Sequence, residues 1–278
     1  MTEAAEPARL DDKSRERVEL ATSMQGLPAA CAFLAEVERQ YRALLAAVPR
    51  KDINPGEWES AAGGNLLYAG VLDEPGRALV VAGNIAGAAT LTAAPDPAAQ
   101  KQAIRDGVVD FLVTSLDEAL RILKNEIRKR ETVAVCVALE PHDLEREMEE
   151  RGVAPDLMRD ATMERRTAQR GHGVLVNWHV AVAPALWLPK LDALAAECLS
   201  GEAAEAQRWL RLAPRYLGRM AQGERMVTAD TEFAASFSER VGQAVERQEI
   251  AVPVTIRICD TAGCTERRFP AAAETIGR

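Results

Sequence analysis

Ser115-Leu116-Asp117-Glu118-Ala119-Leu120-Arg121 is the stretch that decides the fold class, together with the run Val133-Ala134-Val135-Cys136-Val137 that follows it. Ser115 and Glu118 have the spacing of a capping box, in which the serine oxygen accepts from the amide of Glu118 and the glutamate reaches back to the amide of Ser115. A helix is therefore predicted from Ser115 to about residue 130. The apolar run that follows, extended to residue 139, is typical of a strand buried on both faces of a parallel sheet.

The neighbouring segments repeat this alternation of strand and helix. Apolar strands are predicted at Ala78-Leu79-Val80-Val81-Ala82, at residues 108–114 and at residues 155–160, and helices at residues 97–106 and 143–151. Strands that alternate with helices through short connections indicate a parallel sheet covered by helices. We therefore predict an α/β protein with a Rossmann-like parallel sheet flanked by helices.

The pattern divides the chain into three parts. Residues 1–63 are predicted as an N-terminal helical segment, residues 64–182 as the Rossmann-like domain, and residues 183–278 as a helical subdomain with a terminal hairpin. The length suits one large domain or a core domain with a smaller addition.

The last part of the chain changes from strand and helix to mainly helical spacing. Residues 174–182 alternate weakly and are predicted as one more strand, whereas residues 184–245 have helical periodicity throughout. Residues 252–258 and 264–269 flank a turn and predict a short β-hairpin.

Composition excludes several classes of protein. A net charge of -8 and an aromatic content of 4% argue against nucleic acid as the main partner. No apolar run reaches the roughly 18 residues of a membrane span, and the polar, acidic N-terminus does not resemble a signal peptide. We therefore expect a cytoplasmic protein without a membrane partner.

The five cysteines are an odd number in a long chain, which favours free thiols in a reducing compartment. Cys259 and Cys264 lie across a predicted turn, so they could form a disulfide or half of a metal site. A zinc site needs four ligands at paired spacing, and the sequence has no second pair, so no metal is expected.

Several motifs together resemble the nicotinamide-binding half of urocanase (urocanate hydratase). That family has an "LDEALR" helix, then a strand, a helix with "D…E…RGV.PD", and a "TDQTSAHD" turn. The matching residues here are Leu116–Arg121, residues 133–137, Asp143, Glu147, Arg151-Gly152-Val153, Pro155-Asp156-Leu157, Asp160 and Thr162. The resemblance implies a Rossmann-like domain that holds a tightly bound NAD, whose nicotinamide acts as an electrophile.

The resemblance also implies which residues would bind NAD. The family's glycine-rich phosphate loop is compared with residues 82–90, which follow the predicted strand and keep two glycines. If NAD binds, its pyrophosphate is expected against the amides of Gly83, Asn84 and Gly87, with Asp160 and Thr162 near the other end. The alternative is that Gly83 and Gly87 only allow close packing between a helix and a strand.

The departures from the family lie where its ligands bind. Glu140 stands where the family has "GN" and would bring negative charge toward a dinucleotide, and the chain has only about half the family's length. Gln25-Gly26-Leu27-Pro28-Ala29-Ala30-Cys31 is similar to the family's "QGLPARIC", but Cys31 is one residue early and precedes the nucleotide domain. A structural role for Cys31 is therefore weighed against a catalytic one.

The three histidines have different surroundings in the sequence. His172 lies between two glycines after the fourth predicted strand, at the edge where open parallel sheets bind ligands. His142 begins a predicted helix and is expected to be exposed, and His179 beside Trp178 is expected in the core. None of them is assigned a catalytic role.

Two functions remain open from these observations. The first is a divergent urocanase-related protein that lacks hydratase activity and serves as a ligand-binding or oligomerising scaffold, with a small molecule as its possible ligand. The second is an NAD-dependent, urocanase-like hydratase (a lyase) that acts on a small heteroaromatic or carboxylate substrate. A homo-oligomer is expected in either case.

Overall fold

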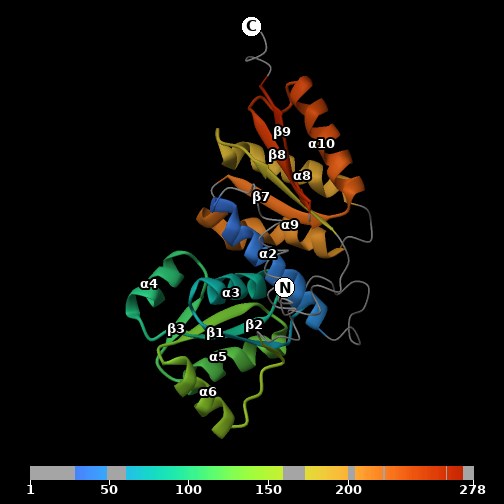
Figure 1. Cartoon of the computed structure of the whole chain (residues 1–278). Helices are drawn as coiled ribbons and strands as arrows, with labels where there is room; N and C mark the ends of the chain where they lie inside the picture. Colours follow the sequence, from blue (N-terminus) through green and yellow to red (C-terminus); the bar gives the residue numbers. More distant parts are fainter. Residues whose placement is uncertain are drawn as a thin grey trace, which may run out of the picture.

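The computed structural model describes residues 29–48, 61–158, 173–199, 204–221, 223–260 and 262–271. Two sheets, one in each half of the chain, are joined by helices that lie between them (Figure 1). No described helix combines the length and the apolar character that a membrane span requires.

The first half contains a five-stranded sheet in the order β3-β4-β2-β1-β5, and all its pairs are parallel. The predicted α/β, Rossmann-like class is therefore confirmed. The strands are β1 (Leu66–Val71), β2 (Ala89–Ala93), β3 (Phe111–Val113), β4 (Val133–Val137) and β5 (Leu157–Met158); the helices are α3 (Glu74–Ala86), α4 (Pro97–Arg105), α5 (Leu116–Lys129) and α6 (Pro141–Glu150).

Successive strand residues face opposite sides of the parallel sheet, as the pleat requires. Leu91 and Val135 pack on the side of α5 and α6, whereas Ala134 and Cys136 belong to the core on the side of α3. Both faces of β2 and β4 are covered, so every residue of these two central strands is buried.

The strand predicted at residues 78–82 is wrong, because these residues form the middle of α3. Every residue from Ala78 to Ala86 is buried, so the helix has no polar stripe that would reveal its period. A short apolar run of this kind does not distinguish a buried strand from a buried helix. The first strand is β1, and Gly87 ends α3 with a φ of 96°.

The start of α5 confirms the predicted helix, with one change in its cap. Ser115 Oγ accepts from the amide of Glu118 at 3.4 Å. The Glu118 carboxylate instead accepts from the amide of Thr114 at 3.0 Å, one residue before the predicted donor.

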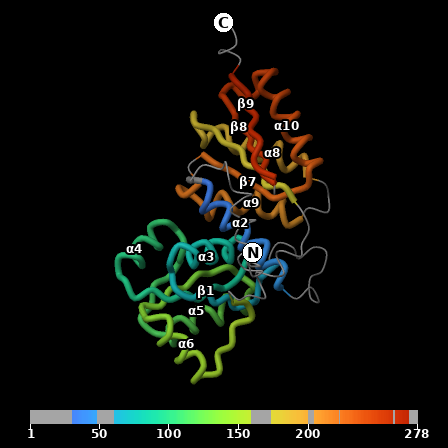
Figure 2. Tube along the Cα trace, in the orientation of Figure 1, coloured from blue at the N-terminus to red at the C-terminus, as the bar shows by residue number. Residues whose placement is uncertain are grey.

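Helices α2 (Ala29–Ala47) and α9 (Ala204–Leu217) lie between the two sheets (Figures 1 and 2). One continuous core includes side chains of α2, α3 and α9 and of the second sheet. The buried guanidinium of Arg208 on α9 donates from Nε to the carbonyl oxygen of Ile85 at 2.8 Å, near the end of α3. A cation is favourable there because helix carbonyls point toward the C-terminus.

The second half contains a four-stranded antiparallel sheet in the order β7-β6-β8-β9. The terminal hairpin is confirmed as β8 and β9, which pair along their length. The strands are β6 (Val174–His179), β7 (Glu224–Ala229), β8 (Val254–Asp260) and β9 (Gly263–Phe269); the helices are α8 (Pro184–Cys198), α10 (Thr231–Glu246) and the short η3 (Gly218–Ala221).

Two details of this half differ from the prediction. Strand β6 was placed in the parallel sheet, but it pairs with β7 and β8 of the second sheet. Strand β7 interrupts the region predicted as continuously helical, because its charged start, Glu224-Arg225, hides the alternation of a half-buried strand. The predicted boundary after residue 182 thus falls after a strand of the second sheet. Residues 1–28 and 49–60 of the predicted N-terminal helical segment lie outside the described residues.

We expect Gly76→Ala to destabilise the fold by about 2 kcal/mol or more, because overpacking against rigid backbone has a cost of this order. An added Cβ at Gly76 would lie 1.9 Å from the carbonyl oxygen of Val71. Urea unfolding measures the change. Gly242→Ala in α10 is the matched control: its nearest contact would be 3.2 Å, to the Phe269 ring, and a change within about 1 kcal/mol is expected. Equal effects of both substitutions would contradict this account of the β1–α3 connection.

Candidate functional site

The carboxyl edge of the parallel sheet is the first place to examine for a ligand site. The chain leaves β1 toward β2 on one side and later crosses to β5 on the other side of β1. Open α/β sheets bind ligands at such a switch point, with phosphate groups at the N-terminus of the helix that follows the strand. Here that helix is α3.

The N-terminus of α3 is closed by the chain itself. Asp73 Oδ1 accepts from the amide of Gly76 at 2.8 Å, and Glu74 adds a second carboxylate in the first turn. Pro75 has no amide hydrogen to donate. A phosphate placed here would compete with one carboxylate for the amide and meet the charge of another.

Other helices at the same edge begin in a similar way. Asp96 accepts from the amides of Ala98 and Ala99 at the start of α4. Helix α6 follows Glu140 and has Pro141 and Asp143 in its first turn. Helix α5 has Asp117 and Glu118 in its first turn, so acidic groups occur at four described helix starts along this edge, and each disfavours an anionic ligand.

Three residues assigned to NAD by resemblance do not form a phosphate cradle. Gly83 lies within α3, where an added Cβ would be 2.7 Å from Leu67 Cδ2 and 2.8 Å from Thr90 Oγ1. Asn84 is buried and donates from Nδ2 to the carbonyl oxygen of Val108 at 3.0 Å. Gly87 follows the last turn of the helix, so the small residues serve the packing of α3 against the sheet.

The other residues that the sequence selected, Asp160, Thr162 and His172, lie outside the described residues. Among the described residues, the edge does not fit the pyrophosphate of NAD. The decisive feature is the Asp73 carboxylate, which already accepts from the amide at the start of α3.

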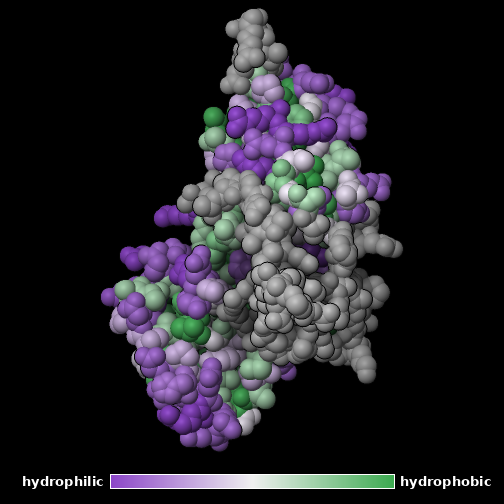
Figure 3. Space-filling view, in the orientation of Figure 1, coloured by the Kyte–Doolittle hydropathy of each residue, from purple (hydrophilic) through white to green (hydrophobic). Residues whose placement is uncertain are grey.

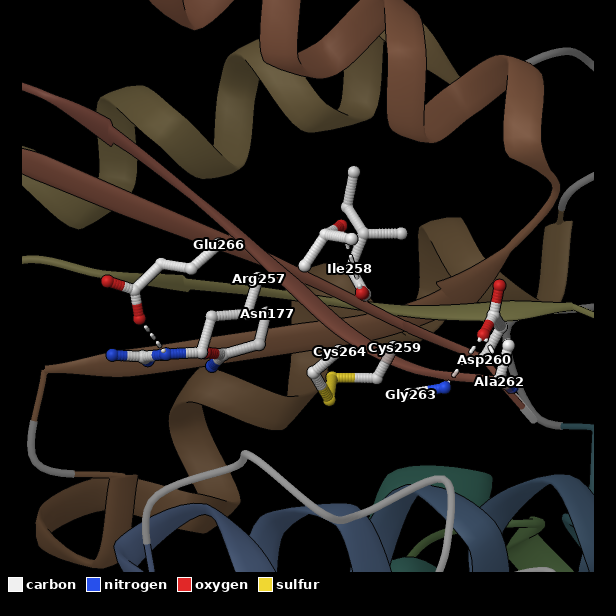
Figure 4. Close-up of a disulfide and its surroundings, with 10 residues drawn as sticks. Asn177, Arg257, Ile258, Cys259, Asp260, Ala262, Gly263, Cys264 and Glu266 are labelled. Atoms are coloured by element: carbon white, nitrogen blue, oxygen red, sulfur yellow. Dashed lines mark hydrogen bonds and ion pairs between the residues drawn. A yellow bond between two sulfur atoms is a disulfide. The ribbon is translucent and has the colours of Figure 1, made fainter.

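A group of buried polar side chains lies on the face of the second sheet that is turned toward α2. Glu224 accepts from Asn177 Nδ2 at 2.8 Å, and Arg257 Nη1 donates to Asn177 Oδ1 at 3.0 Å. Arg257 Nε also donates to Glu266 at 2.9 Å. Figure 4 shows Asn177, Arg257 and Glu266 on one side of the sheet and Ile258 on the other.

Cys31 and His179 both reach this group, although they are far apart in the sequence. His179 Nδ1 lies 3.0 Å from Glu224 Oε1, and Cys31 at the start of α2 is fully buried near the same carboxylate. Burial, and then the negative charge of Glu224, raises the pKa of the Cys31 thiol to about 12. A protonated, buried thiol is a poor nucleophile, which supports the structural role for Cys31.

The other histidine prediction can be compared directly. His142 is exposed at the start of α6, as predicted, and its Nε2 lies 3.3 Å from Asp143 Oδ1. His179 is only partly buried, so it borders the core instead of lying within it.

Cys259 and Cys264, whose pairing the sequence left open, form a disulfide across β8 and β9 (Figure 4). The Asp260 carboxylate accepts from the amides of Ala262 and Gly263 in the turn between them. Within the described part of the chain, no group of three or more His, Cys, Asp or Glu side chains could hold a metal ion.

A cavity of about 510 Å³ lies beside β7, the edge strand of the second sheet. Its walls come from α2, α9, β7 and the start of α10. The amide of Thr228 on β7 donates to Glu38 Oε1 at 3.3 Å, and Tyr41 donates its hydroxyl proton to the carbonyl oxygen of Glu205 at 2.9 Å. Burial raises the pKa of Glu38 above its ordinary value, against the opposing effect of Arg42.

One residue in the sequence indicates this cavity. Glu38 lies between Leu34 and Tyr41 at helical spacing, so it is a charged residue on a buried face of α2. Buried carboxylates are uncommon unless they are paired, and such a residue marks a position for closer study.

Residues 41–169 match the family model of the urocanase Rossmann-like domain. This match confirms the resemblance to urocanase and covers the parallel sheet. The second sheet lies beyond it. A curated relative, S-methyl thiourocanate hydratase of Variovorax sp. (strain JCM 16519 / RA8), is 32% identical over 104 residues. That alignment covers 37% of this chain and 19% of the relative, so most of the relative has no matched counterpart here.

We expect Cys198 to react with a thiol reagent at pH 8 in the native protein, whereas Cys31 and Cys136 do not. Cys198 is partly exposed, but the other two are buried, with thiol pKa values raised to about 12 and about 11. Labelling followed by peptide mass spectrometry identifies the modified residues. Cys198→Ser should remove native labelling, and all three thiols should react in denaturant. Rapid labelling of Cys31 in the native protein would instead indicate an activated nucleophile.

Proposed function

We propose that this chain is a urocanase-related scaffold that binds a small ligand and does not hydrate urocanate. The observation that carries this proposal is the closed N-terminus of α3, where Asp73 accepts from the Gly76 amide at the switch point of the sheet. The family's reaction needs NAD. At this edge, however, a dinucleotide would meet carboxylates of the described residues where it needs free backbone amides. The chain has the Rossmann-like fold, but the carboxyl edge of its parallel sheet carries negative charge where the family would bind NAD.

The absence of hydratase activity is supported by the surroundings of the candidate groups. General acid–base catalysis needs a titratable group within hydrogen-bond reach of the substrate. Cys31 is buried beside Glu224. His142 is exposed at the start of α6, with Asp143 as its neighbour. No hydrogen bond among the described residues links these two groups, so they do not form a catalytic pair.

The second candidate is an NAD-dependent, urocanase-like lyase. It is favoured by the match of residues 41–169 and by the name of the relative, which acts on S-methyl thiourocanate. In that case the phosphate contacts would have to come from outside the described residues, where Asp160 and Thr162 lie.

We expect no NAD in the supernatant of the denatured protein, no thermal shift on adding NAD, and no loss of urocanate or S-methyl thiourocanate absorbance. The reason is the competition and like charge at the start of α3. Asp73→Asn keeps a side chain that can cap the helix and removes its charge. A shift with NAD only in this variant would assign the exclusion to the Asp73 charge. Stoichiometric NAD or substrate turnover by the parent protein would support the lyase instead.

The proposed oligomer has support at the edge of the parallel sheet. Strand β3 is the last in the sheet order, so its outer edge has no strand neighbour among the described residues. Phe111 and Leu112 on β3 and Ile104 on α4 are exposed large apolar side chains. An exposed edge strand with apolar residues is a template for pairing with a second chain. On the face of the first half that Figure 3 shows, the coloured residues are mainly hydrophilic, with small hydrophobic spots.

We expect Phe111→Asp to lower the molar mass found by light scattering after gel filtration, because a buried charge would oppose pairing through β3. Leu186→Asp is the control, since Leu186 is also exposed but lies on α8 of the other half. A monomeric parent, or the same molar mass in both variants and the parent, would refute an interface at β3.

A further inference from the structure

The cavity beside β7 has the size and the enclosure of a small-molecule site. Its volume of about 510 Å³ falls in the range of ligand pockets, roughly 300–1,000 Å³. Most of its wall comes from α9, β7 and α10, which lie beyond the residues that match the urocanase model. The inference below rests on the proposed ligand-binding function and names the site and the class of ligand.

Glu38 is the most informative residue in the cavity wall. Its side chain is only 6% exposed, yet it carries a carboxylate on the buried side of α2. One oxygen accepts from the Thr228 amide, which covers part of the free edge of β7. A glutamine could accept the same hydrogen bond without the cost of burying a charge. The cap of β7 alone therefore does not explain why the side chain is acidic, and the charges of Arg42 and Arg39 on the same helix favour its ionised form.

The charges around the cavity favour a positively charged ligand. Four carboxylate residues line it, and Arg42 is the one basic residue among the described lining residues. Asp230 is engaged, since it accepts from the Phe233 amide at the start of α10. Arg42 offsets part of the charge of Glu38. The remaining carboxylates of the wall are Glu205 and Glu232.

The rest of the wall is suited to an apolar or aromatic group. Tyr41 and Trp209 are in contact as a tilted ring pair, with centroids 5.2 Å apart. Trp209 donates its Nε1 proton to the carbonyl oxygen of Met226. Phe233 and Val227 line another part of the wall. Because Tyr41 and Trp209 are held by hydrogen bonds, this surface is preformed.

We propose that the cavity binds a small organic cation, with its ammonium group paired to Glu38 and its apolar body against Trp209 and Phe233. A desolvated ion pair with a hydrogen bond is among the stronger polar contacts in proteins. Aromatic faces add to the attraction for a cation. The same arrangement disfavours a carboxylate of equal size, because that ligand would face Glu38 with like charge.

The test uses the full chain and three probes of matched shape: 2-phenylethylamine, 2-phenylethanol and 3-phenylpropanoate. Isothermal titration calorimetry at pH 7.5 should find the amine bound at least about tenfold more tightly than the other two, as expected for one charge-assisted hydrogen bond. Glu38→Gln should remove this preference and change the affinity for the alcohol by less than about twofold. Glu36→Gln, on the same helix but outside the cavity wall, should leave all three affinities unchanged.

A second variant keeps the test independent of the stability of Glu38→Gln. Ala206 lines the cavity from α9, and Ala206→Phe should fill it and abolish binding of the amine. Equal affinities of the three probes for the parent, no binding of the amine, or an amine preference that survives both Glu38→Gln and Ala206→Phe would overturn the inference. These outcomes are separate from those of the NAD and urocanate assays, which decide the proposed function.

Discussion

The structure depends on the position of α3, which is enclosed between the parallel sheet on one side and α2 and α9 on the other. A helix covered on both sides cannot expose a polar stripe, so it is apolar from Ala78 to Ala82 and has small residues at Gly76 and Gly83. Its last turn accepts the buried Arg208 guanidinium from α9. Because the two halves of the chain share this helix, they have one continuous core. The choice of residues in α3 is therefore explained by packing.

The same constraint determines which elements could be predicted from the sequence. Helix α5 has one apolar face, a capped start and a clear end, so its pattern alone identified it, and β4 followed from a uniform apolar run between turn signals. Helix α3 lacks these features, and its central run of five apolar residues was read as a strand. Strands β6 and β7 are half-buried, and which strands they pair with depends on contacts that no local pattern records. The fold class could therefore be predicted from the sequence, but the sheet to which each strand belongs could not.

The candidate site was harder to predict from the sequence than the fold, for a related reason. Gly83, Asn84 and Gly87 were selected because small residues after a strand predict a phosphate loop, and that inference failed with the strand itself. The sequence Asp73-Glu74-Pro75 is typical of a helix start. That this start lies at the ligand edge of the sheet follows only from the position of β1 before it. Cys31 and His179 meet at Glu224 only through the packing of α2 on the second sheet. Such long-range neighbours follow from the assembled fold.

The capped helix starts at the carboxyl edge of the parallel sheet have a direct consequence for the binding of anions there. Amides at helix N-termini attract anions, and a carboxylate cap such as Asp73 or Asp96 satisfies the same amides from within the chain. Such a cap stabilises the helix and competes with an anion for the same amides. Glu38, by contrast, lies on a helix that contacts both halves of the chain. A buried carboxylate has a cost in folding free energy, and here the Thr228 amide and the charge of Arg42 offset part of it.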